Sequence, residues 1–80
     1  MDKIYAMQLF LRVAELESFT RAAETLSLPK GSVSRQIQAL ENALGTQLLH
    51  RTTRRVSLTQ DGMVYYECAK DLLMNLRSEE

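Results

Sequence analysis

Residues 18–44 read SFTRAAETLSLPKGSVSRQIQALENAL, and apolar residues in this stretch recur at helical spacing. The pattern predicts a short helix that begins near Thr20 as its N-cap, followed by a longer helix from residue 29 or 30 to residue 43 or 44. Pro29 suits the first turn of the longer helix, where its missing N–H costs nothing. Gly45 is a natural residue to end that helix. Two such helices joined by a tight turn meet the requirements of a helix-turn-helix.

The longer helix is expected to have one buried and one open face, because Val33, Ile37, Leu40 and Leu44 recur on one side of it. At about 100° per residue, its polar residues then point away from that stripe. Short polar and basic side chains on an open helix face suit the reading of base edges in the major groove, although an ordinary solvated face has the same composition. The candidate DNA-contacting residues on this helix are Lys30, Gly31, Ser32, Ser34, Arg35 and Gln38.

The flanking segments complete a mainly α architecture. Residues 3–16 predict an amphipathic helix, and residues 47–58 predict a two-stranded hairpin with a polar tip at residues 52–54. Thr59 can cap a final long helix with Asp61 in its first turn. We therefore expect a winged helix-turn-helix, with a three-helix core and a two-stranded wing, followed by a long linker helix.

This order predicts two functional parts. Residues 1–59 form the DNA-binding domain, with the helix-turn-helix at about 18–37 and the wing at about 47–58, and residues 60–80 form a linker and dimerisation helix. At the start of the second helix, Thr20 and Arg21 are candidates for contact with the phosphate backbone. The wing supplies Arg51, Thr53 and Arg54, and Arg54 is a candidate for minor-groove insertion. The alternative for the wing is a charged turn that arginines keep soluble.

The final helix carries apolar residues on more than one side. Tyr66, Ala69, Leu73 and Leu76 fall at heptad-like positions and are the candidate dimerisation residues. The alternative is that this stripe packs on the first helix of the same chain. Because further apolar residues lie on other sides of the helix, we expect a second partner, and hence a homodimer that reads a roughly palindromic DNA site.

Charge is segregated along the sequence although the 80 residues have a formal net charge of zero. Residues 20–60 hold six basic and two acidic residues, which gives this stretch a net charge of +4, and the remaining residues balance it. Such segregation can produce a basic face on a neutral protein, which suits a nucleic-acid partner.

Composition excludes several other classes of protein. Cys68 is the only cysteine and His50 the only histidine, so neither a disulfide framework nor a structural zinc site is expected. A single free cysteine favours the cytoplasm, and no apolar run reaches the length of about 20 residues that a membrane span needs. We expect no metal and no cofactor in this chain. An enzyme is disfavoured, because the sequence has no phosphate loop, metal-ligand cluster or nucleophile with a plausible base.

Several motifs resemble those of the LysR-type transcriptional regulators over almost the whole chain. They are Ser18-Phe19-Thr20-Arg21-Ala22-Ala23-Glu24, Val33-Ser34-Arg35-Gln36-Ile37, Leu40-Glu41, Leu44-Gly45, Leu48, Arg51-Thr52 and Leu58-Thr59-Gln60-Asp61-Gly62. Pro29 stands where the family often has Ser, and Leu49 where it usually has Phe. Lys30 and Gly31 also depart from the residues common at those positions.

The resemblance implies a domain that binds double-stranded DNA sequence-specifically to control transcription in a bacterium. It further implies a longer parent protein, in which a C-terminal domain absent from this sequence binds a small-molecule effector. In that family the linker helix mediates dimerisation, and the remainder of the protein assembles tetramers. The alternative function is a winged-helix module that binds another protein and not DNA; its binding would lack a steep dependence on salt.

Overall fold

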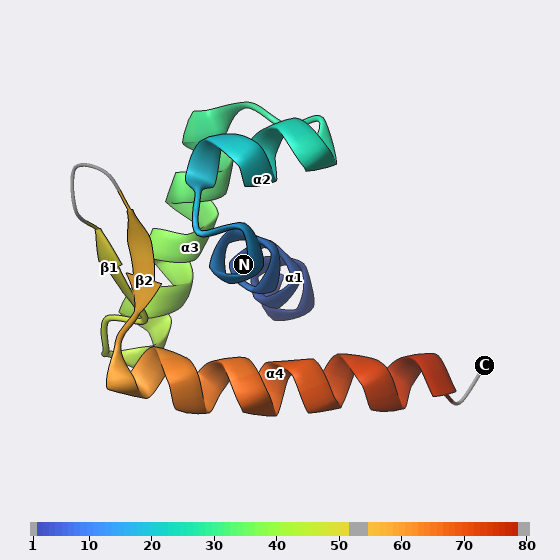
Figure 1. The fold of residues 1–80 in the computed structure, drawn as a ribbon. Coiled ribbons are helices and arrows are strands. Elements are labelled where there is room, and N and C mark those ends of the chain that lie inside the picture. Colours follow the sequence, from blue (N-terminus) through green and yellow to red (C-terminus); the bar gives the residue numbers. More distant parts are fainter. Residues whose placement is uncertain (1, 52–54, 79–80) are drawn as a thin grey trace.

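The computed structural model describes residues 2–51 and 55–78, in the order of three helices, a two-stranded hairpin and a long helix (Figure 1). This mainly α arrangement confirms the predicted winged helix-turn-helix with its linker helix. The predicted wing tip at residues 52–54 lies outside the described residues.

Helix α1 spans Lys3–Leu16, as the apolar spacing predicted. The side chain of Asp2 caps its start by accepting hydrogen bonds from the backbone N–H groups of Ile4 and Tyr5, both at 3.1 Å. The helix ends at Glu17, whose left-handed backbone (φ 54°) turns the chain toward the next helix.

Helices α2 (Phe19–Leu26) and α3 (Lys30–Leu44) are joined by a turn of three residues. Ser27 adopts a left-handed conformation with φ 57°, and the N–H of Leu28 donates to the carbonyl of Ala23 at 2.9 Å. These two features satisfy free carbonyl groups at the end of α2 and reverse the chain direction. The tight turn that a helix-turn-helix needs is therefore present.

The starts of α2 and α3 differ from the sequence-based expectation. Thr20 is not the N-cap of α2, because Ser18 has the extended backbone of a cap and its Oγ accepts the N–H of Arg21 at 3.1 Å. Thr20 is the second residue of the helix. Pro29 occupies the cap position of α3 with an extended backbone (ψ 140°) and no side-chain cap bond, and its carbonyl accepts from Ser32 and Val33.

The core lies where α1, α2 and α3 meet, and the hairpin closes one side of it. Phe10, Val33 and Ile37 are fully buried at its centre. The predicted stripe on α3 is buried as far as Leu40, but Leu44, in the last turn, is 44% exposed. Gly45 ends the helix in a left-handed conformation (φ 72°), as predicted.

Strands β1 (Leu49–Arg51) and β2 (Val56–Leu58) pair antiparallel, with Leu49 opposite Leu58 and Arg51 opposite Val56. Alternate residues of a strand face the same side, so Arg51 shares a face with Leu49. Because Leu49 and Val56 are buried, that shared face is the one that packs on the helices. The side chain of Arg51 therefore points toward α2 and α3 and not away from the protein.

Helix α4 spans Gln60–Ser78, and Thr59 caps it as predicted, since Thr59 Oγ1 accepts the N–H of Gly62 at 2.9 Å. The same hydroxyl donates to the carbonyl of Gln47 at 2.6 Å, and the N–H of Thr59 donates to the carbonyl of Leu48 at 3.0 Å. A Cβ on Gly62 would collide with the Leu48 carbonyl oxygen. The first turn of α4 thus lies directly on the backbone that leads into β1.

Farther along, α4 packs across α1 (Figure 1). The ring of Phe10 makes edge-to-face contacts with Tyr65 at 5.4 Å and with Tyr66 at 6.5 Å between ring centroids. Among the described residues no helix combines the length and the hydropathy that crossing a membrane requires.

Candidate nucleic-acid interface

The open face of α3 carries most of the residues predicted to contact DNA. Val33 and Ile37 anchor the helix in the core with 0% exposure, which fixes the rotation of the helix about its axis. The six residues of α3 that were predicted to contact DNA lie outside this buried stripe. Lys30, Gly31, Arg35 and Gln38 are exposed, while Ser32 and Ser34 are half-buried. The structure therefore brings this group together on one helix, in its first three turns.

Arg35 and Gly31 are in close contact on this face. A Cβ on Gly31 would lie 3.3 Å from Nη1 and 3.9 Å from Cζ of Arg35. The guanidinium thus folds back over the first turn of α3, where the absence of a side chain leaves room for it. This contact places the positive charge of Arg35 near the N-terminal end of the helix, the part that enters the major groove in helix-turn-helix proteins.

The start of α2 contributes Thr20 and Arg21, and both are exposed. Capping by Ser18 leaves the Thr20 hydroxyl without the local role that the sequence suggested for it. Both residues lie in the first turn, where backbone N–H groups and the helix dipole favour an anion. Their contact with phosphate stays a prediction.

The residues predicted on the wing divide into two groups. Thr53 and Arg54 lie outside the described residues. Arg51 is described, and its guanidinium Nη2 lies 3.2 Å from Oε1 of Glu41, while its Cζ lies 5.1 Å from the centroid of the Phe19 ring. Arg51 therefore bridges β1 to both helices of the helix-turn-helix, and its predicted backbone contact is untested.

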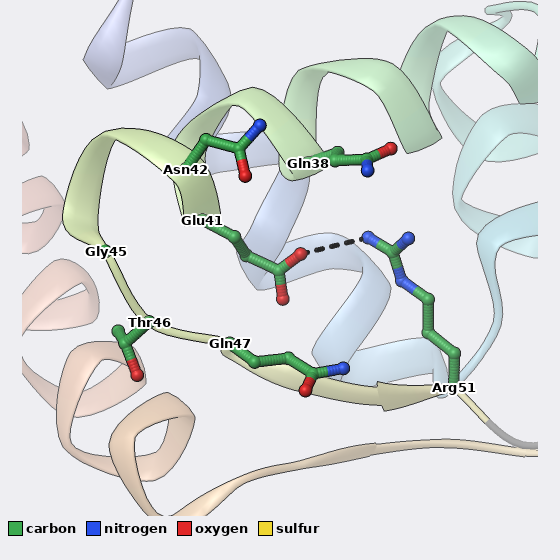
Figure 2. A pocket seen from close by; sticks show the side chains of 7 residues that line it. All are labelled: Gln38, Glu41, Asn42, Gly45, Thr46, Gln47 and Arg51. Atoms are coloured by element: carbon green, nitrogen blue, oxygen red, sulfur yellow. Dashed lines mark hydrogen bonds and ion pairs between the residues drawn. The ribbon is translucent and has the colours of Figure 1, made fainter.

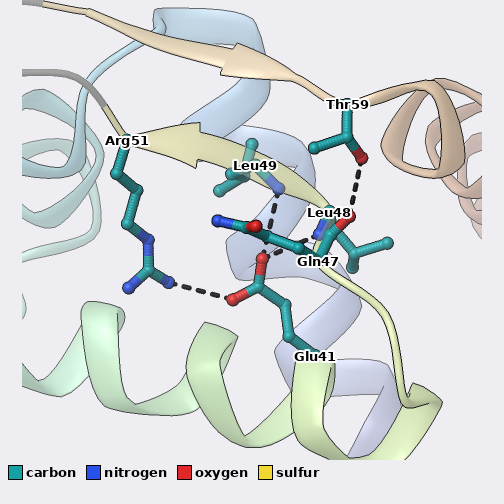
Figure 3. A network of polar contacts seen from close by, with 6 residues as sticks. All are labelled: Glu41, Gln47, Leu48, Leu49, Arg51 and Thr59. Carbon is teal, nitrogen blue, oxygen red and sulfur yellow. Dashed lines mark hydrogen bonds and ion pairs between the residues drawn. The ribbon is translucent and has the colours of Figure 1, made fainter.

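Sequence reasoning missed the role of Glu41. Its second oxygen, Oε2, accepts the backbone N–H groups of Leu48 at 2.8 Å and Leu49 at 3.1 Å (Figure 3). The sequence offered one signal for such a role: Glu41 is an acidic residue next to Leu40 of the buried stripe, within a stretch that is otherwise mostly basic. The backbone partners could not be foreseen, because they depend on how the chain returns after Gly45.

An open cleft of about 440 Å³ lies beside this network, between α3 and the start of β1 (Figure 2). Gln38, from the predicted contact set, lines it together with Arg51. The other lining residues are Glu41, Asn42, Gly45, Thr46 and Gln47. The cleft therefore continues the polar face of α3 toward the wing.

The predicted dimerisation residues of α4 face different surroundings. Ala69 is 1% exposed within this single chain and Tyr66 is half-buried against α1, as the alternative of packing within the chain predicted. Leu73 is half-buried, and the Leu76 side chain is outside the described set. Four other apolar side chains of this helix are more than half exposed: Met63, Val64, Leu72 and Met74.

A helix-turn-helix whose second helix presents a polar face beside a two-stranded wing defines a winged helix-turn-helix DNA-binding domain. Residues 4–63 match the model of the bacterial regulatory helix-turn-helix proteins of the lysR family. The chain belongs to this family.

Individual relatives agree with this assignment. The chain is 75% identical over 95% of its length to an uncharacterized HTH-type transcriptional regulator, YhjC, of Escherichia coli strain K12, of which it covers 25%. It superposes on the BenM_DBD complex with catB site 1 DNA with a TM-score of 0.92 at 41% identity, covering 95% of this chain and 84% of that one. Full-length BenM gives a TM-score of 0.91 at 41% identity, again over 95% of this chain. The chain spans about a quarter of the curated relatives and of full-length BenM.

Proposed function

We propose that this chain is the sequence-specific, double-stranded DNA-binding part of a longer transcriptional regulator, with α3 in the major groove. The observation that carries this proposal is the polar face of α3, on which Lys30, Arg35 and Gln38 are exposed while Val33 and Ile37 hold the opposite side in the core. The likeness to BenM_DBD, whose structure was solved on DNA, supports it. The role is that of a binding module and not of an enzyme, and it operates in the cytoplasm, where bacterial DNA lies.

The contacts divide by element. On α3, Arg35 and Lys30 supply charge for guanine edges or phosphates, and Ser32, Ser34 and Gln38 supply hydrogen bonds. Thr20 and Arg21 on α2 approach one phosphate backbone, while Thr53 and Arg54 extend the interface from the wing. Residues 1–59 are the DNA-binding domain in this proposal, and residues 60–80 are its linker.

We further propose that the chain acts as a homodimer through α4. The residues that support this are the apolar side chains left exposed on the single chain, above all Val64 and Leu72, which lie two helical turns apart on one side. Leu73 and Leu76 extend the predicted interface. Leu72→Glu is expected to yield a monomer in analytical ultracentrifugation, and a dimer of unchanged stability would reject this interface.

Each protomer of the dimer would bind one half-site of a pseudo-palindromic operator. The two half-sites would be about one turn of the DNA helix apart, or a multiple of it. The chain covers only 25% of full-length BenM, which supports a longer parent protein. In that parent we place a C-terminal domain that binds a small-molecule effector, and assembly into tetramers. The DNA-binding part itself needs no cofactor.

Selection of bound duplexes from a random-sequence library tests the proposal and returns the half-site in one experiment. Enrichment of a paired motif is the expected result. If the dimer neutralises about six to ten phosphates, affinity falls about 10³- to 10⁵-fold between about 50 and 200 mM salt. If no motif is enriched and the affinity for DNA does not change with salt concentration, DNA binding would be rejected in favour of a protein-interaction module.

A further inference from the structure

Glu41 gathers three hydrogen-bond donors from the chain segment that begins the wing. Its Oε2 accepts the N–H groups of Leu48 and Leu49 at 2.8 and 3.1 Å, and its Oε1 lies 3.2 Å from Nη2 of Arg51 (Figure 3). The side chain of Glu41 is only 11% exposed, and its bonds to the two backbone N–H groups are partly buried, whereas its contact with Arg51 lies at the surface. Hydrogen bonds to an ionised carboxylate are stronger than neutral ones. Both ends of β1 are therefore held to α3 through one side chain, the start through Leu48 and Leu49 and the end through Arg51.

Arg51 extends the same attachment to α2. Its guanidinium lies over the ring of Phe19 with Cζ at 5.1 Å from the centroid, which is within the range of a cation–π contact. The side chain of Arg51 is 33% exposed, in contrast to the open side chains on α3. Glu41 and Phe19 thus determine where the guanidinium of Arg51 lies, and Arg51 joins the wing to both helices of the helix-turn-helix.

We propose that Glu41 is a positioning residue for DNA recognition, which acts through Arg51 to set the wing relative to α3; this inference rests on the proposed function. Arg51 ends β1 and pairs with Val56, the first residue of β2, so its contact with Glu41 acts at the far end of the paired strands. With α3 in the major groove and the wing beside it, the angle between them decides whether both can contact one site. Glu41 therefore contributes to discrimination between sequences without touching DNA.

Two physical effects of Glu41 predict opposite results when its charge is removed. A carboxylate near the DNA repels phosphates, so electrostatics alone predicts that Glu41→Gln strengthens binding to every duplex. Loss of wing position instead weakens binding only where both elements must contact a defined site. Gln keeps one acceptor oxygen for the backbone N–H groups and loses the ion pair with Arg51, so this variant isolates the contact in question.

The experiment measures affinity for two duplexes, the sequence enriched by the wild-type chain from a random library and a scrambled duplex of the same composition. Glu41→Gln is expected to lower affinity for the enriched duplex about tenfold, while affinity for the scrambled duplex stays level or rises. Glu24→Gln is the matched control, because Glu24 is an exposed acid in the same basic stretch. It is expected to leave the ratio of the two affinities unchanged.

A second variant tests the route through Arg51. Arg51→Met leaves Glu41 bonded to Leu48 and Leu49 and is expected to lower the same ratio, while adding Glu41→Gln in that background should lower it little further. Circular dichroism well below each melting temperature ensures that folded protein is compared. If Glu41→Gln does not fold, Glu41→Asp, which keeps the charge but shortens the reach to Arg51, replaces it and is expected to lower the same ratio. A ratio that stays at the wild-type value in the folded variants would overturn the inference. A wild-type chain that binds neither duplex would overturn the proposed function, and the inference with it.

Discussion

The guanidinium Nη1 of Arg35 lies 3.3 Å from the position that a Cβ on Gly31 would occupy, so Arg35 rests on the only residue of α3 without a side chain. The contact is confined to exposed atoms and supports no part of the core. The approach places the guanidinium of Arg35, the side chain to which we assign most of the recognition by α3, over the first turn of that helix.

Arg35→Ala is expected to weaken DNA binding by about 1–3 kcal/mol and to leave folding within about 0.5 kcal/mol of wild type. If Arg35 contacts a base, the loss is concentrated at one position of each half-site. If it contacts a phosphate, the loss is similar for all sequences and the salt dependence becomes shallower. Titrations against the enriched duplex and its single-base variants distinguish these cases. Wild-type affinity in a folded Arg35→Ala chain would show that α3 does not use this face.

Gly31→Ala is expected to have opposite effects on stability and on binding. Alanine favours a helix over glycine by up to about 1 kcal/mol, so the melting temperature should rise. The added methyl group displaces the end of Arg35 by a few tenths of an ångström, so DNA affinity should fall. In an Arg35→Ala background the same change should leave affinity unaltered, because the displaced side chain is gone. Equal losses in both backgrounds would mean that position 31 itself contacts DNA.

Ser18→Ala is expected to destabilise the chain by about 1 kcal/mol, because it removes the acceptor for the N–H of Arg21 at the start of α2. Thr20→Ala is the matched control, and it should change the free energy of unfolding by less than about 0.5 kcal/mol. Chemical denaturation of both variants provides the comparison. A larger loss from Thr20→Ala would restore Thr20 as the cap.

Gly62→Ala is expected to destabilise the fold by about 1–3 kcal/mol or more, because the added Cβ meets the Leu48 carbonyl group and neither backbone can move freely. Gln60→Ala changes an exposed residue in the same turn and should have little effect. Thermal unfolding followed by circular dichroism compares the two. Equal melting temperatures would mean that α4 does not approach β1 this closely.

Tyr65→Phe is expected to reduce the loss of stability at alkaline pH. Burial raises the pKa of Tyr65 above its ordinary value of 10.0, so the folded chain holds the phenol proton more tightly than the unfolded chain does. This contribution to stability is complete below pH 10.0 and is lost as the pH rises through the folded pKa. The free energy of unfolding should therefore fall more steeply above pH 10.0 in wild type than in Tyr65→Phe. Parallel pH profiles would contradict the assignment.

The sequence was sufficient where local chemistry decides the structure. Apolar spacing located α1 and α3, and Gly45 and Thr59 end and begin helices as their residue types favour. Ser18 and Thr20 are both good capping residues two positions apart, so sequence alone did not separate them. Only the structure identifies the extended backbone of Ser18.

Contacts between distant segments were beyond the sequence argument. The partners of Glu41 are backbone groups of Leu48 and Leu49, whose direction depends on the fold of the whole chain. The same limit applies to α4, where the spacing of Tyr66 and Ala69 fits an interface with either a second chain or α1. Packing within the chain covers Ala69 and leaves Leu72 exposed.

The junction between α4 and the base of β1 bears on how regulators of this kind can be recombined. Thr59 holds the carbonyl groups of Gln47 and Leu48, and the hydroxyl of Thr46 donates to Asp61 at 2.6 Å. The opening turn of α4 is thus a structural part of the wing. A chimera that joins this DNA-binding domain to another protein should therefore be spliced beyond Ala69, since a junction at residue 60 would remove Asp61 and Gly62 from their contacts with Thr46 and Thr59.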